Sequence, residues 1–540
     1  MEKFHWRVHS LVRRTNTIFG FGWLFHEDSE IAVLSLLLSF SARTCAIRAE
    51  HGKARTDVQQ AYPCHRLALN SGFILYGGCP TDLGDMTGAD LVGTLENGDA
   101  FELQLPAGCP RDLDQPATEA SRKWLLLQAG MMLKRGWGLV RQGQLSNLVD
   151  QARRFLGQRG TFPHGSVSEV IAEVMSVTPA RIVLVIDHDL GGGANQYSSA
   201  LVAEKIRRGA AVLLLSYKVH TLSHVLLLSS RKANRRYTIH GTEFILDLAR
   251  EIPLDEITYN TAVSFAKPEE IPQLIAKLKR IGNPRLTMLL HEYFMLCPSH
   301  FLLNDQGEFC GLPERGRCQT CLDTNQQGYA TLFLARNMQQ WRALWGSALS
   351  LADEIVTFSN SSGMLLSRAY PGLDLSRVSV TPHTAKHVRL QPVQAAYVAS
   401  LRIGVVGHIA YHKGAKIVRE LAREILRRKS DIKIVVFGTL DASCDPAVVQ
   451  VTGSYKQARL PALIRERGAN TFLFPSICPE TFSYVVQELM GFGLPVACLD
   501  LGAPPERLRD YSKGQVLADH SAASVLDALI DLHRRVYLSD

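Results

Sequence analysis

The chain has no apolar run of the roughly 20 residues that a helix needs to cross a lipid bilayer. The segment IAVLSLLLSFSA is too short and is typical of one or two buried strands. The N-terminus carries basic residues followed by TIFGFGWLF, which resembles a secretion signal. It has no small-residue cleavage site and continues directly into HEDSE, so the pattern does not indicate such a signal.

The cysteines show no framework pattern. There are 11 of them, an odd and scattered set in a chain of 540 residues. Small secreted domains held together by disulfides instead carry even sets at regular spacings. We therefore expect reduced thiols and a cytoplasmic protein.

Length and composition bound the fold. A chain of 540 residues is too long for one core, and about three domains are expected. With 46% hydrophobic and 20% charged residues, the composition is that of an ordinary globular protein. The net charge of +8 is modest for this size.

Residues 1–112 predict a small antiparallel β-sandwich domain. Short apolar runs alternate with turn-rich pieces, and LVGTLENGDAFELQL predicts a hairpin with Asn97-Gly98 as its turn. Trp23 is either core filler or a stacking platform for a sugar.

Residues 113–177 predict a basic helical linker. Seven Lys or Arg lie between Arg122 and Arg154 against one acid, Asp150. Such a segment can lie on an anionic membrane surface or pack its apolar face on a neighbouring domain.

From residue 178 onward, strands and helices alternate in two series. The first series, 178–395, contains RIVLVID, a glycine turn, a helix over 195–208, and the strands AVLLLSY, TMLLHEY, EIVTFS and VSVTPH. The second, 396–540, contains the strands LRIGVVG, IKIVVFG, FLFPS and PVACLD and ends in a helix over 522–535. The fold class is therefore α/β, with two Rossmann-like doubly wound lobes after the β domain and the linker.

Glu480 and Glu488 lie eight positions apart in PSICPETFSYVVQELMGFGLPVACLDLGAPPE. Residues 471–474 read as a buried strand, and helical spacing begins near Thr481 and ends at the following glycines. The backbone N–H groups of the helix start, at Phe482, Ser483 and Tyr484, favour an anion. Carboxylates beside an anion site suit a polyhydroxylated ligand that carries phosphate.

This segment resembles the E-x(7)-E signature of retaining, nucleotide-sugar-dependent glycosyltransferases of the GT-B fold, in the large family numbered four. RIGVVGHIAYHKGAKIVRELAREIL, IKIVVFG and GLPVACLDLGAPPE extend the similarity. The pieces GFGWLF, ARTDVQQAYP and NSGFILYG resemble an accessory β domain of bacterial polysaccharide and O-antigen transferases. The resemblance covers about residues 178–540 and implies a glycosyltransferase whose active site lies between two lobes.

The resemblance also assigns roles to residues. It places Glu488 on the ribose hydroxyls, Glu480 near the sugar hydroxyls and Lys413 on the diphosphate. His291, at the end of TMLLHEY, matches a histidine that lies against the donor sugar. Glu480, His291 and Lys413 form the expected catalytic set, and the expected donor site is completed by Glu488, His408, Gly407, Gly414, Phe482, Ser483, Tyr484, Gly438 and Tyr455. Family members often have Arg where this chain has His408.

Gly191, Gly192 and Gly193 follow the first strand of the first lobe in DHDLGGGANQY. They let the backbone approach a ligand phosphate or the acceptor, or serve the turn alone. Gln196 occupies the last position of a G-x-G-x-x-G pattern, so dinucleotide binding is not supported.

Four cysteines gather in an insertion at 297–321, CPSHFLLNDQGEFCGLPERGRCQTC. Cys297, Cys310, Cys318 and Cys321 could hold a structural zinc through four thiolates, although the spacing is not that of a standard finger. The resemblance implies no cofactor for catalysis itself.

The function implied is transfer of a sugar from a nucleoside diphosphate to a glycan or lipid-linked acceptor in bacterial lipopolysaccharide, capsule or exopolysaccharide synthesis. Peripheral contact with the inner membrane fits the basic linker, and no nucleic-acid partner is expected. A sugar-nucleotide epimerase or phosphorylase of the same fold is one alternative. A polysaccharide-binding protein that has lost activity is another, and His408 is the feature in its favour.

Overall fold

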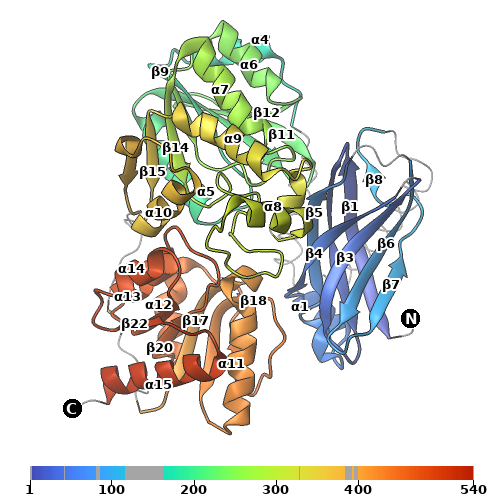
Figure 1. The fold of residues 1–540 in the computed structure, drawn as a ribbon, viewed down its shortest axis with the longest axis vertical. Helices are drawn as coiled ribbons and strands as arrows, with labels where there is room; N and C mark the ends of the chain where they lie inside the picture. Colours follow the sequence, from blue (N-terminus) through green and yellow to red (C-terminus); the bar gives the residue numbers. More distant parts are fainter. Residues whose placement is uncertain are drawn as a thin grey trace. The chain divides into compact units, whose positions relative to one another are not determined.

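The computed structural model describes residues 3–41, 43–80, 85–115, 162–327, 329–383, 392–393 and 399–538. The chain divides into two compact units (Figure 1). The first comprises residues 1–50, 73–289 and 328–354, and the second comprises residues 51–72, 290–327 and 355–540.

The first unit begins with a β domain. Its strands are β1 (Phe4–Arg14), β2 (Thr17–His26), β3 (Ile31–Phe40), β4 (Thr44–Lys53), β5 (Gly72–Gly78), β6 (Met86–Leu95), β7 (Ala100–Gln104) and β8 (Arg111–Asp112). They hydrogen-bond in the order β7-β6-β3-β4-β5-β2-β1-β8. The β1–β2, β3–β4, β3–β6 and β6–β7 pairs are antiparallel, and only the short β8 joins β1 in parallel among these. The expected antiparallel domain and its β6–β7 hairpin are confirmed.

Strands far apart in this order share one core. Buried Leu11 of β1, Leu24 of β2, Leu36 of β3 and Leu91 of β6 belong to a single hydrophobic cluster. The sheet therefore folds over on itself, because only a curled sheet brings one face of both ends to a common core. Trp23 on β2 is half-buried with its ring 6.1 Å from Phe25, and a sugar-binding role for it stays a prediction.

Cys45 on β4 forms a disulfide with Cys79, which follows β5. The expectation of reduced thiols throughout is wrong at this pair. The two strands are neighbours in the sheet, so residues 34 apart in sequence come to a Cα–Cα distance of 6.2 Å. The spacing of the cysteines gives no sign of this pairing. The other nine cysteines form no disulfide among the described residues.

The first α/β sheet has a parallel centre. Its strands β9 (Arg181–Ile186), β10 (Ala210–Lys218), β11 (Ser223–Ser229), β12 (Asn234–Ile239), β13 (Glu256–Tyr259) and β14 (Arg285–Leu290) lie in the order β12-β11-β10-β9-β13-β14. β10, β9, β13 and β14 are parallel, whereas β11 and β12 form an antiparallel edge that sequence analysis missed. The helices of this lobe are α4 (Val167–Ser176), α5 (Gly193–Arg207), α6 (Glu243–Glu251), α7 (Glu270–Gly282) and α9 (Met338–Ser350).

The second α/β sheet lies in the second unit and is entirely parallel. Its strands β17 (Arg402–Ile409), β18 (Lys433–Leu440), β19 (Val449–Val451), β20 (Thr471–Phe474), β21 (Val496–Leu499) and β22 (Gly514–Leu517) lie in the order β19-β18-β17-β20-β21-β22. This is the 3-2-1-4-5-6 order of the Rossmann fold. Its helices are α11 (Ala415–Arg427), α12 (Leu460–Arg467), α13 (Tyr484–Gly491), α14 (Ala503–Leu508) and α15 (Ala522–Tyr537).

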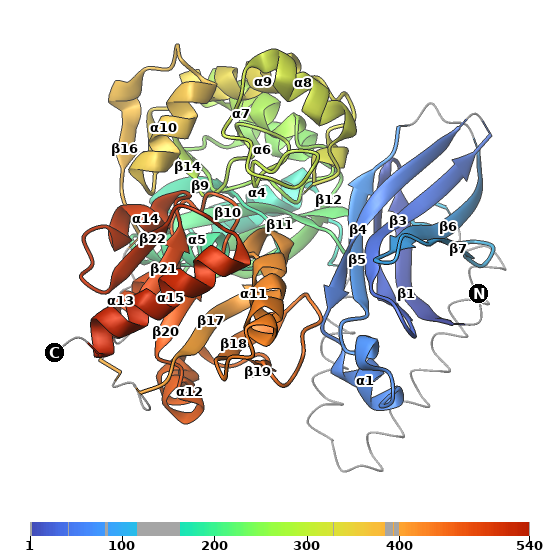
Figure 2. The ribbon, with the colours of Figure 1, turned by 60° about the horizontal axis from the view of Figure 1, so that its bottom comes forward.

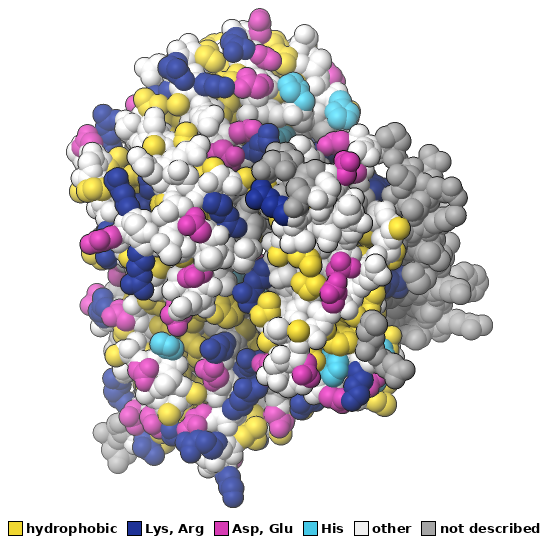
Figure 3. All heavy atoms as spheres, turned by 45° about the vertical axis from the view of Figure 1, so that its right-hand side comes forward, with side chains coloured by type: hydrophobic (Ala, Val, Ile, Leu, Met, Phe, Trp, Pro, Cys, Tyr) yellow, Lys and Arg dark blue, Asp and Glu magenta, His cyan; other side chains and the backbone are white. Residues whose placement is uncertain are grey.

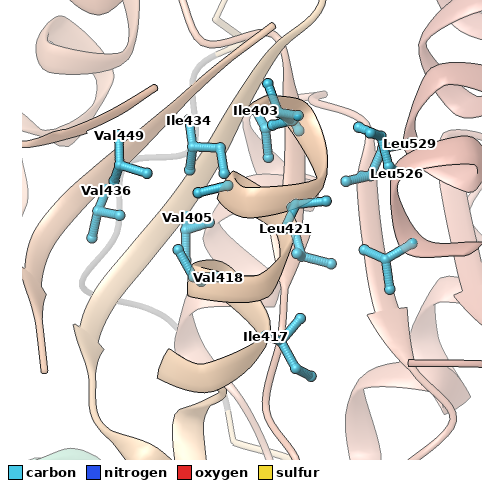
Figure 4. Close-up of a cluster of buried hydrophobic side chains, with 14 of the residues drawn as sticks. Ile403, Val405, Ile417, Val418, Leu421, Ile434, Val436, Val449, Leu526 and Leu529 are labelled. Atoms are coloured by element: carbon cyan, nitrogen blue, oxygen red, sulfur yellow. The ribbon is translucent and has the colours of Figure 1, made fainter. Parts of the chain in front are cut away.

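Alternate residues of these strands enter two different cores, as a doubly wound sheet requires. Ile434 and Val436 of β18 pack with α11 and α15 (Figure 4). Their neighbours Val435 and Phe437 pack with α12 and α13 on the other face. Figure 2 shows α11 and α15 side by side, in agreement with their direct contact. The expected Rossmann-like lobes are confirmed.

Several shorter elements complete the second unit. They are α1 (Thr56–Ala61), α8 (Arg315–Thr324), β15 (Glu354–Thr357), α10 (Asn360–Ala369) and β16 (Val378–Val380), with β15 and β16 parallel. The α1 segment separates β4 from β5 in sequence, yet it belongs to the second unit. The α8 segment carries the last two cysteines of the predicted zinc set.

The basic linker predicted for 113–177 falls largely on residues 116–161, which lie outside the described residues. Within the part of the chain that is described, no helix is both long enough and apolar enough to cross a membrane. Figure 3 shows a face on which Lys and Arg are interspersed with Asp and Glu, so positive charge is not segregated there.

Candidate active site

The topology of the second sheet places a site before any side chain is considered. Strand order reverses between β17 and β20, because β18 continues the sheet on one side of β17 and β20 on the other. In open parallel sheets, the crevice at the carboxyl ends of such strands is where ligands bind. The loops that follow β17 and β20 contain Lys413 and Glu480 respectively.

Lys413 and Glu480 meet at this point. The Lys413 ammonium forms an ion pair with the Glu480 carboxylate, which also accepts a hydrogen bond from the Ser476 hydroxyl at 3.3 Å. Burial opposes the charged form of Lys413, but the Glu480 carboxylate outweighs it and raises the pKa of Lys413. The Lys413 side chain keeps 34% exposure, so it stays cationic and within reach of a ligand.

Gly414 allows the two loops to approach each other. Its φ of +85° is left-handed, and a Cβ there would lie 2.0 Å from the carbonyl oxygen of Pro475. The backbone N–H of Ile477 also donates to the carbonyl oxygen of His412 at 3.1 Å. The turn after β17 is therefore held directly against the turn after β20.

Three histidines surround this lysine turn. The His412 ring stacks on Phe301 with a centroid distance of 3.9 Å, and His300 lies beside Phe301. Burial, with the nearby Lys413 cation next in effect, lowers the pKa of His412 well below its usual range. His412 is therefore neutral and cannot supply the positive charge that an arginine would. His408 is more exposed, and its ring contacts Thr439 and Asp441.

Glu488 lies inside the lobe, on α13. It is 4% exposed and accepts a hydrogen bond from the Gln457 side-chain amide. Burial raises the pKa of Glu488, and the Gln457 bond partly opposes this. Tyr455 lies near Glu488. Burial, and to a smaller degree the Glu488 charge, raise the pKa of Tyr455 to about 12. The structure thus brings together Glu488 and Tyr455, both predicted for the donor site.

The helix that carries Glu488 starts later than expected. It begins at Tyr484 rather than near Thr481, with Ser483 as N-cap, whose hydroxyl accepts from the Val486 N–H at 3.3 Å. Phe482 therefore precedes the helix, because the Ser483 cap fixes the start. The prediction of a row of helix-start amides from Phe482 is wrong in that respect.

His291 lies directly after β14 and is hydrogen-bonded to the segment that contains Glu480. The Thr481 hydroxyl donates to the His291 carbonyl oxygen at 2.8 Å. The His291 ring stacks on Phe358 at 4.4 Å and lies 5.2 Å from the His383 ring. The segment after β14 is thereby joined to the E-x(7)-E segment within the second unit.

Two neighbouring residues were missed from the sequence. His383 contacts Phe482 and Tyr484, with the Tyr484 hydroxyl 3.2 Å from its Nδ1 atom. Burial lowers the pKa of His383 to about 4. Arg507 lies over the Phe482 ring at 3.7 Å, and burial lowers its pKa to about 10. Arg507 lies in GAPPER, and its position just after a glycine turn is the one feature of the sequence that could have indicated a functional role.

The glycine run of the first lobe belongs to the first unit. Gly191 and Gly192 are exposed with φ of +82° and +89°, and Gly193 starts α5. The Gly191 N–H donates to Asn195 Oδ1 at 2.7 Å, and the Asn195 amide donates to Asp187 at 2.8 Å. Burial raises the pKa of Asp187 to about 6. The buried Asp187 side chain therefore holds the glycine loop in place through Asn195.

The remaining predicted glycines and cysteines are also located. Gly407 and Gly438 lie opposite each other in the β17–β18 ladder, so they shape the strand ends. Cys310 lies near Cys318 and Cys321. Burial is the main cause that raises the pKa of the Cys310 thiol, and these two neighbouring cysteines raise it further. No three of the four sulfur atoms of Cys297, Cys310, Cys318 and Cys321 lie within 4.8 Å of one another among the described residues. Three of the four cysteines are thus neighbours, and the structural zinc stays a prediction.

The second α/β lobe matches a known family of proteins. Residues 391–535 match the family model "Glycosyl transferases group 1", a stretch shorter than half of the chain. This stretch contains the second sheet, Lys413, Glu480 and Glu488. The second α/β lobe is therefore a glycosyltransferase domain, and the expected class of enzyme is confirmed. A search of curated proteins gave no significant match.

Solved structures give loose likenesses. HepE of Anabaena, in complex with UDP and glucose, is 16% identical with a TM-score of 0.41, over 65% of this chain and 89% of that one. Sucrose-phosphate synthase of Thermosynechococcus elongatus is 13% identical with a TM-score of 0.44, over 66% and 92%. The catalytic domain of starch synthase IV from Arabidopsis thaliana, bound to ADP and acarbose, is 11% identical with a TM-score of 0.40, over 67% and 92%.

Proposed function

We propose that this chain is a retaining glycosyltransferase that moves a sugar from a nucleoside diphosphate to a glycan or lipid-linked acceptor. The acceptor belongs to bacterial surface polysaccharide synthesis. One observation carries the proposal: the Lys413–Glu480 pair lies at the switch point of the sheet in the domain that matches the glycosyltransferase family.

Lys413 answers the main chemical demand of the reaction. Breaking the bond between sugar and phosphate leaves negative charge on the departing diphosphate, and a fixed cation beside it lowers the barrier. Lys413 is held in place by Glu480 and kept charged by it. Because Lys413 can stabilise the departing diphosphate without a metal ion, we propose that catalysis needs no cofactor.

The two glutamates take different parts of the donor. Glu488 is buried, paired with the Gln457 amide and next to Tyr455, which suits the ribose hydroxyls below a base. Glu480 is occupied by Lys413 and Ser476, which suits a role in holding sugar hydroxyls rather than in attacking the anomeric carbon. Retention then follows from attack by the acceptor hydroxyl on the face that the diphosphate leaves.

The proposal is tested with purified protein. A thermal-shift screen against nucleotide sugars identifies a donor, and transfer from it is measured with a lipid-linked acceptor. Glu488→Ala and Lys413→Ala are each expected to abolish transfer and leave the fold intact. Lys416→Ala is the matched control, because Lys416 lies on α11 with 60% of its side chain exposed. Full transfer by either site variant would contradict the proposal.

An epimerase of this fold would act on the nucleotide sugar alone. Incubation of the donor without an acceptor separates the two activities, because a transferase leaves the sugar configuration unchanged. A protein that only binds polysaccharide would neither bind the donor nor turn it over.

A structural zinc in the 297–321 insertion is a separate proposal. Cys318 and Cys321 lie three residues apart on α8 and therefore share a face, with Cys310 nearby. The four sulfur atoms would have to move closer together to hold the ion, because tetrahedral zinc keeps each sulfur about 2.3 Å away. Metal analysis of the wild type and Cys318→Ser decides it, since absence of stoichiometric zinc from the wild type ends the idea.

Membrane contact is proposed on the charge of the linker alone. Binding to vesicles with anionic lipid, compared with neutral vesicles, tests it for the full chain, and no nucleic-acid partner is proposed.

A further inference from the structure

The segment between β4 and β5 forms part of the second unit. Residues 51–72 include the last residues of β4 and the first residue of β5, and they contact the end of β18. The Asn70 amide donates to the Leu440 carbonyl oxygen at 2.8 Å, and Lys53 forms an ion pair with Asp441 at 2.9 Å. A Cβ at Gly52 would lie 2.8 Å from the carbonyl oxygen of Asp441, so the two backbones are in close contact.

Asp441 is shared by two partners, Lys53 and His408. Its side chain is 4% exposed, and its Oδ2 atom lies 2.9 Å from Lys53 Nζ and 3.2 Å from His408 Nε2. The other ring nitrogen of His408 contacts the Thr439 hydroxyl. Asp441 and Thr439 together fix the plane of the His408 ring, and Lys53 fixes Asp441.

His408 and Lys53 lie within electrostatic reach of the lysine turn. His412 is buried in that turn, and its pKa is lowered first by burial and then by Lys413, His300, Lys53 and His408. The same groups would act on a ligand phosphate near Lys413, because Coulomb interactions in a partly buried site are weakly screened. The segment from the N-terminal part of the chain therefore adds a cation to this cluster.

A buried carboxylate needs pairing on all sides. Removing one partner of such a group leaves charge uncompensated in a low-dielectric site. Without Lys53, the Asp441 Oδ2 atom would keep the His408 ring but lose the ammonium that pairs with its charge. Asp441 would then be free to shift, and the His408 ring that it holds at Nε2 would shift with it.

We propose that Lys53 is a positioning residue of the donor site: it holds Asp441, and through Asp441 it fixes the His408 ring beside the turn that binds the diphosphate of the nucleotide sugar. The inference rests on the proposed function. The ligand chemistry is a diphosphate, and residues 51–72 contribute to its binding within the second unit. The competing explanation is that Lys53 only secures this segment to the lobe.

The experiment measures binding to the full chain by calorimetry. The probes are UDP, ADP and GDP, the matching nucleosides, and inorganic pyrophosphate, which needs no choice of base. The variants are Lys53→Met, Lys53→Arg and His408→Gln. Arg55→Met is the matched control, because Arg55 lies on the same segment and pairs with its near neighbour Asp57 at 2.8 Å.

Lys53→Met is expected to weaken binding of the best nucleoside diphosphate and of pyrophosphate about tenfold, with nucleoside binding unchanged. Lys53→Arg should restore binding, and Arg55→Met should behave as wild type. Lys53→Met combined with His408→Gln should lose no more than either alone, since both act through one interaction. The donor KM should rise about tenfold in Lys53→Met, with kcat changed less.

Each other outcome is decisive. If the wild type binds nucleoside diphosphates and Lys53→Met binds them equally, the inference is overturned and the proposed function stands. Equal weakening of nucleoside and diphosphate binding, with a lowered melting temperature, assigns Lys53 only to holding the segment and also overturns it. If the wild type binds neither nucleoside diphosphates nor pyrophosphate, the proposed function falls and takes the inference with it.

Discussion

The ammonium of Lys413 and the carboxylate of Glu480 form an ion pair where the loops after β17 and β20 meet. The two residues are far apart in sequence, and a parallel sheet whose order reverses between these strands brings them together. The pair unites the expected diphosphate-binding group with the expected sugar-binding group at one point.

Glu480→Gln should reduce transfer more than stability. The Lys413 side chain is 34% exposed, so losing the ion pair is expected to cost about 1 kcal/mol or less of unfolding free energy. The amide cannot hold Lys413 as an ion pair, and kcat/KM should fall at least about tenfold. Urea unfolding and donor kinetics measure the two effects. Glu420→Gln, which alters a surface pair with Lys416, serves as control. Wild-type kcat/KM in Glu480→Gln would count against the site.

Gly414→Ala should disturb the same point through the backbone. Its Cβ would lie 2.0 Å from the Pro475 carbonyl oxygen at a left-handed φ, so one of the two turns must move. We expect a loss of about 1–3 kcal/mol in unfolding free energy, with loss of donor binding. Gly372→Ala is the control, because a Cβ there meets nothing within 4 Å. Equal stability of the two variants would show that the turns are not tightly apposed.

Gln457→Ala should alter the pH dependence of donor binding. The pKa of Glu488 is raised by burial and held back by the Gln457 bond, so removing the amide raises it further. An ionised carboxylate accepts ribose hydroxyls best, so affinity should fall as pH drops through the pKa of Glu488. Dissociation constants measured across acidic and neutral pH should show this fall at a higher pH in Gln457→Ala. Gln450→Ala, an exposed change on β19, should follow the wild type. Coincident curves for wild type and Gln457→Ala would contradict the coupling.

The sequence predicted the second lobe well because its signals are local. Buried strands such as 471–474 are continuous apolar runs, and glycines mark the turns after them. Lys413, Glu480 and Glu488 lie next to these signals, so their elements could be assigned from the sequence, whereas their roles were proposed from resemblance and stay predictions. The start of α13 was misplaced by about three residues because apolar spacing begins before the Ser483 cap.

What the sequence could not show depends on contacts between distant segments. Cys45 and Cys79 pair only because β4 and β5 are neighbours in a sheet whose order does not follow the sequence. Lys53 reaches Asp441 across 388 positions, and no periodicity reports such a contact. His383 and Arg507 were missed for the same reason, since a lone histidine or arginine in a loop has many ordinary explanations.

His383→Phe should flatten the dependence of stability on acid. Burial lowers the pKa of His383 to about 4, against an ordinary value of 6.5, and the Arg507 cation acts in the same direction. Above pH 6.5 the ring is neutral in both states and contributes fully. As pH falls toward 4, the unfolded chain takes up a proton that the folded protein refuses, so the wild type loses stability over this window. The loss is about 2 kcal/mol, allowing for partial exposure of the ring.

Phenylalanine keeps the ring contacts with Phe358 and Phe482 but cannot be protonated. It also loses the contact with the Tyr484 hydroxyl, so some stability should be lost equally at every pH. Urea unfolding at several pH values between 4 and 7 separates the two effects. His520→Phe, a change at an exposed histidine, controls for removing any imidazole. If the wild-type and His383→Phe curves run parallel across this range, His383 is not buried as a neutral ring beside Arg507.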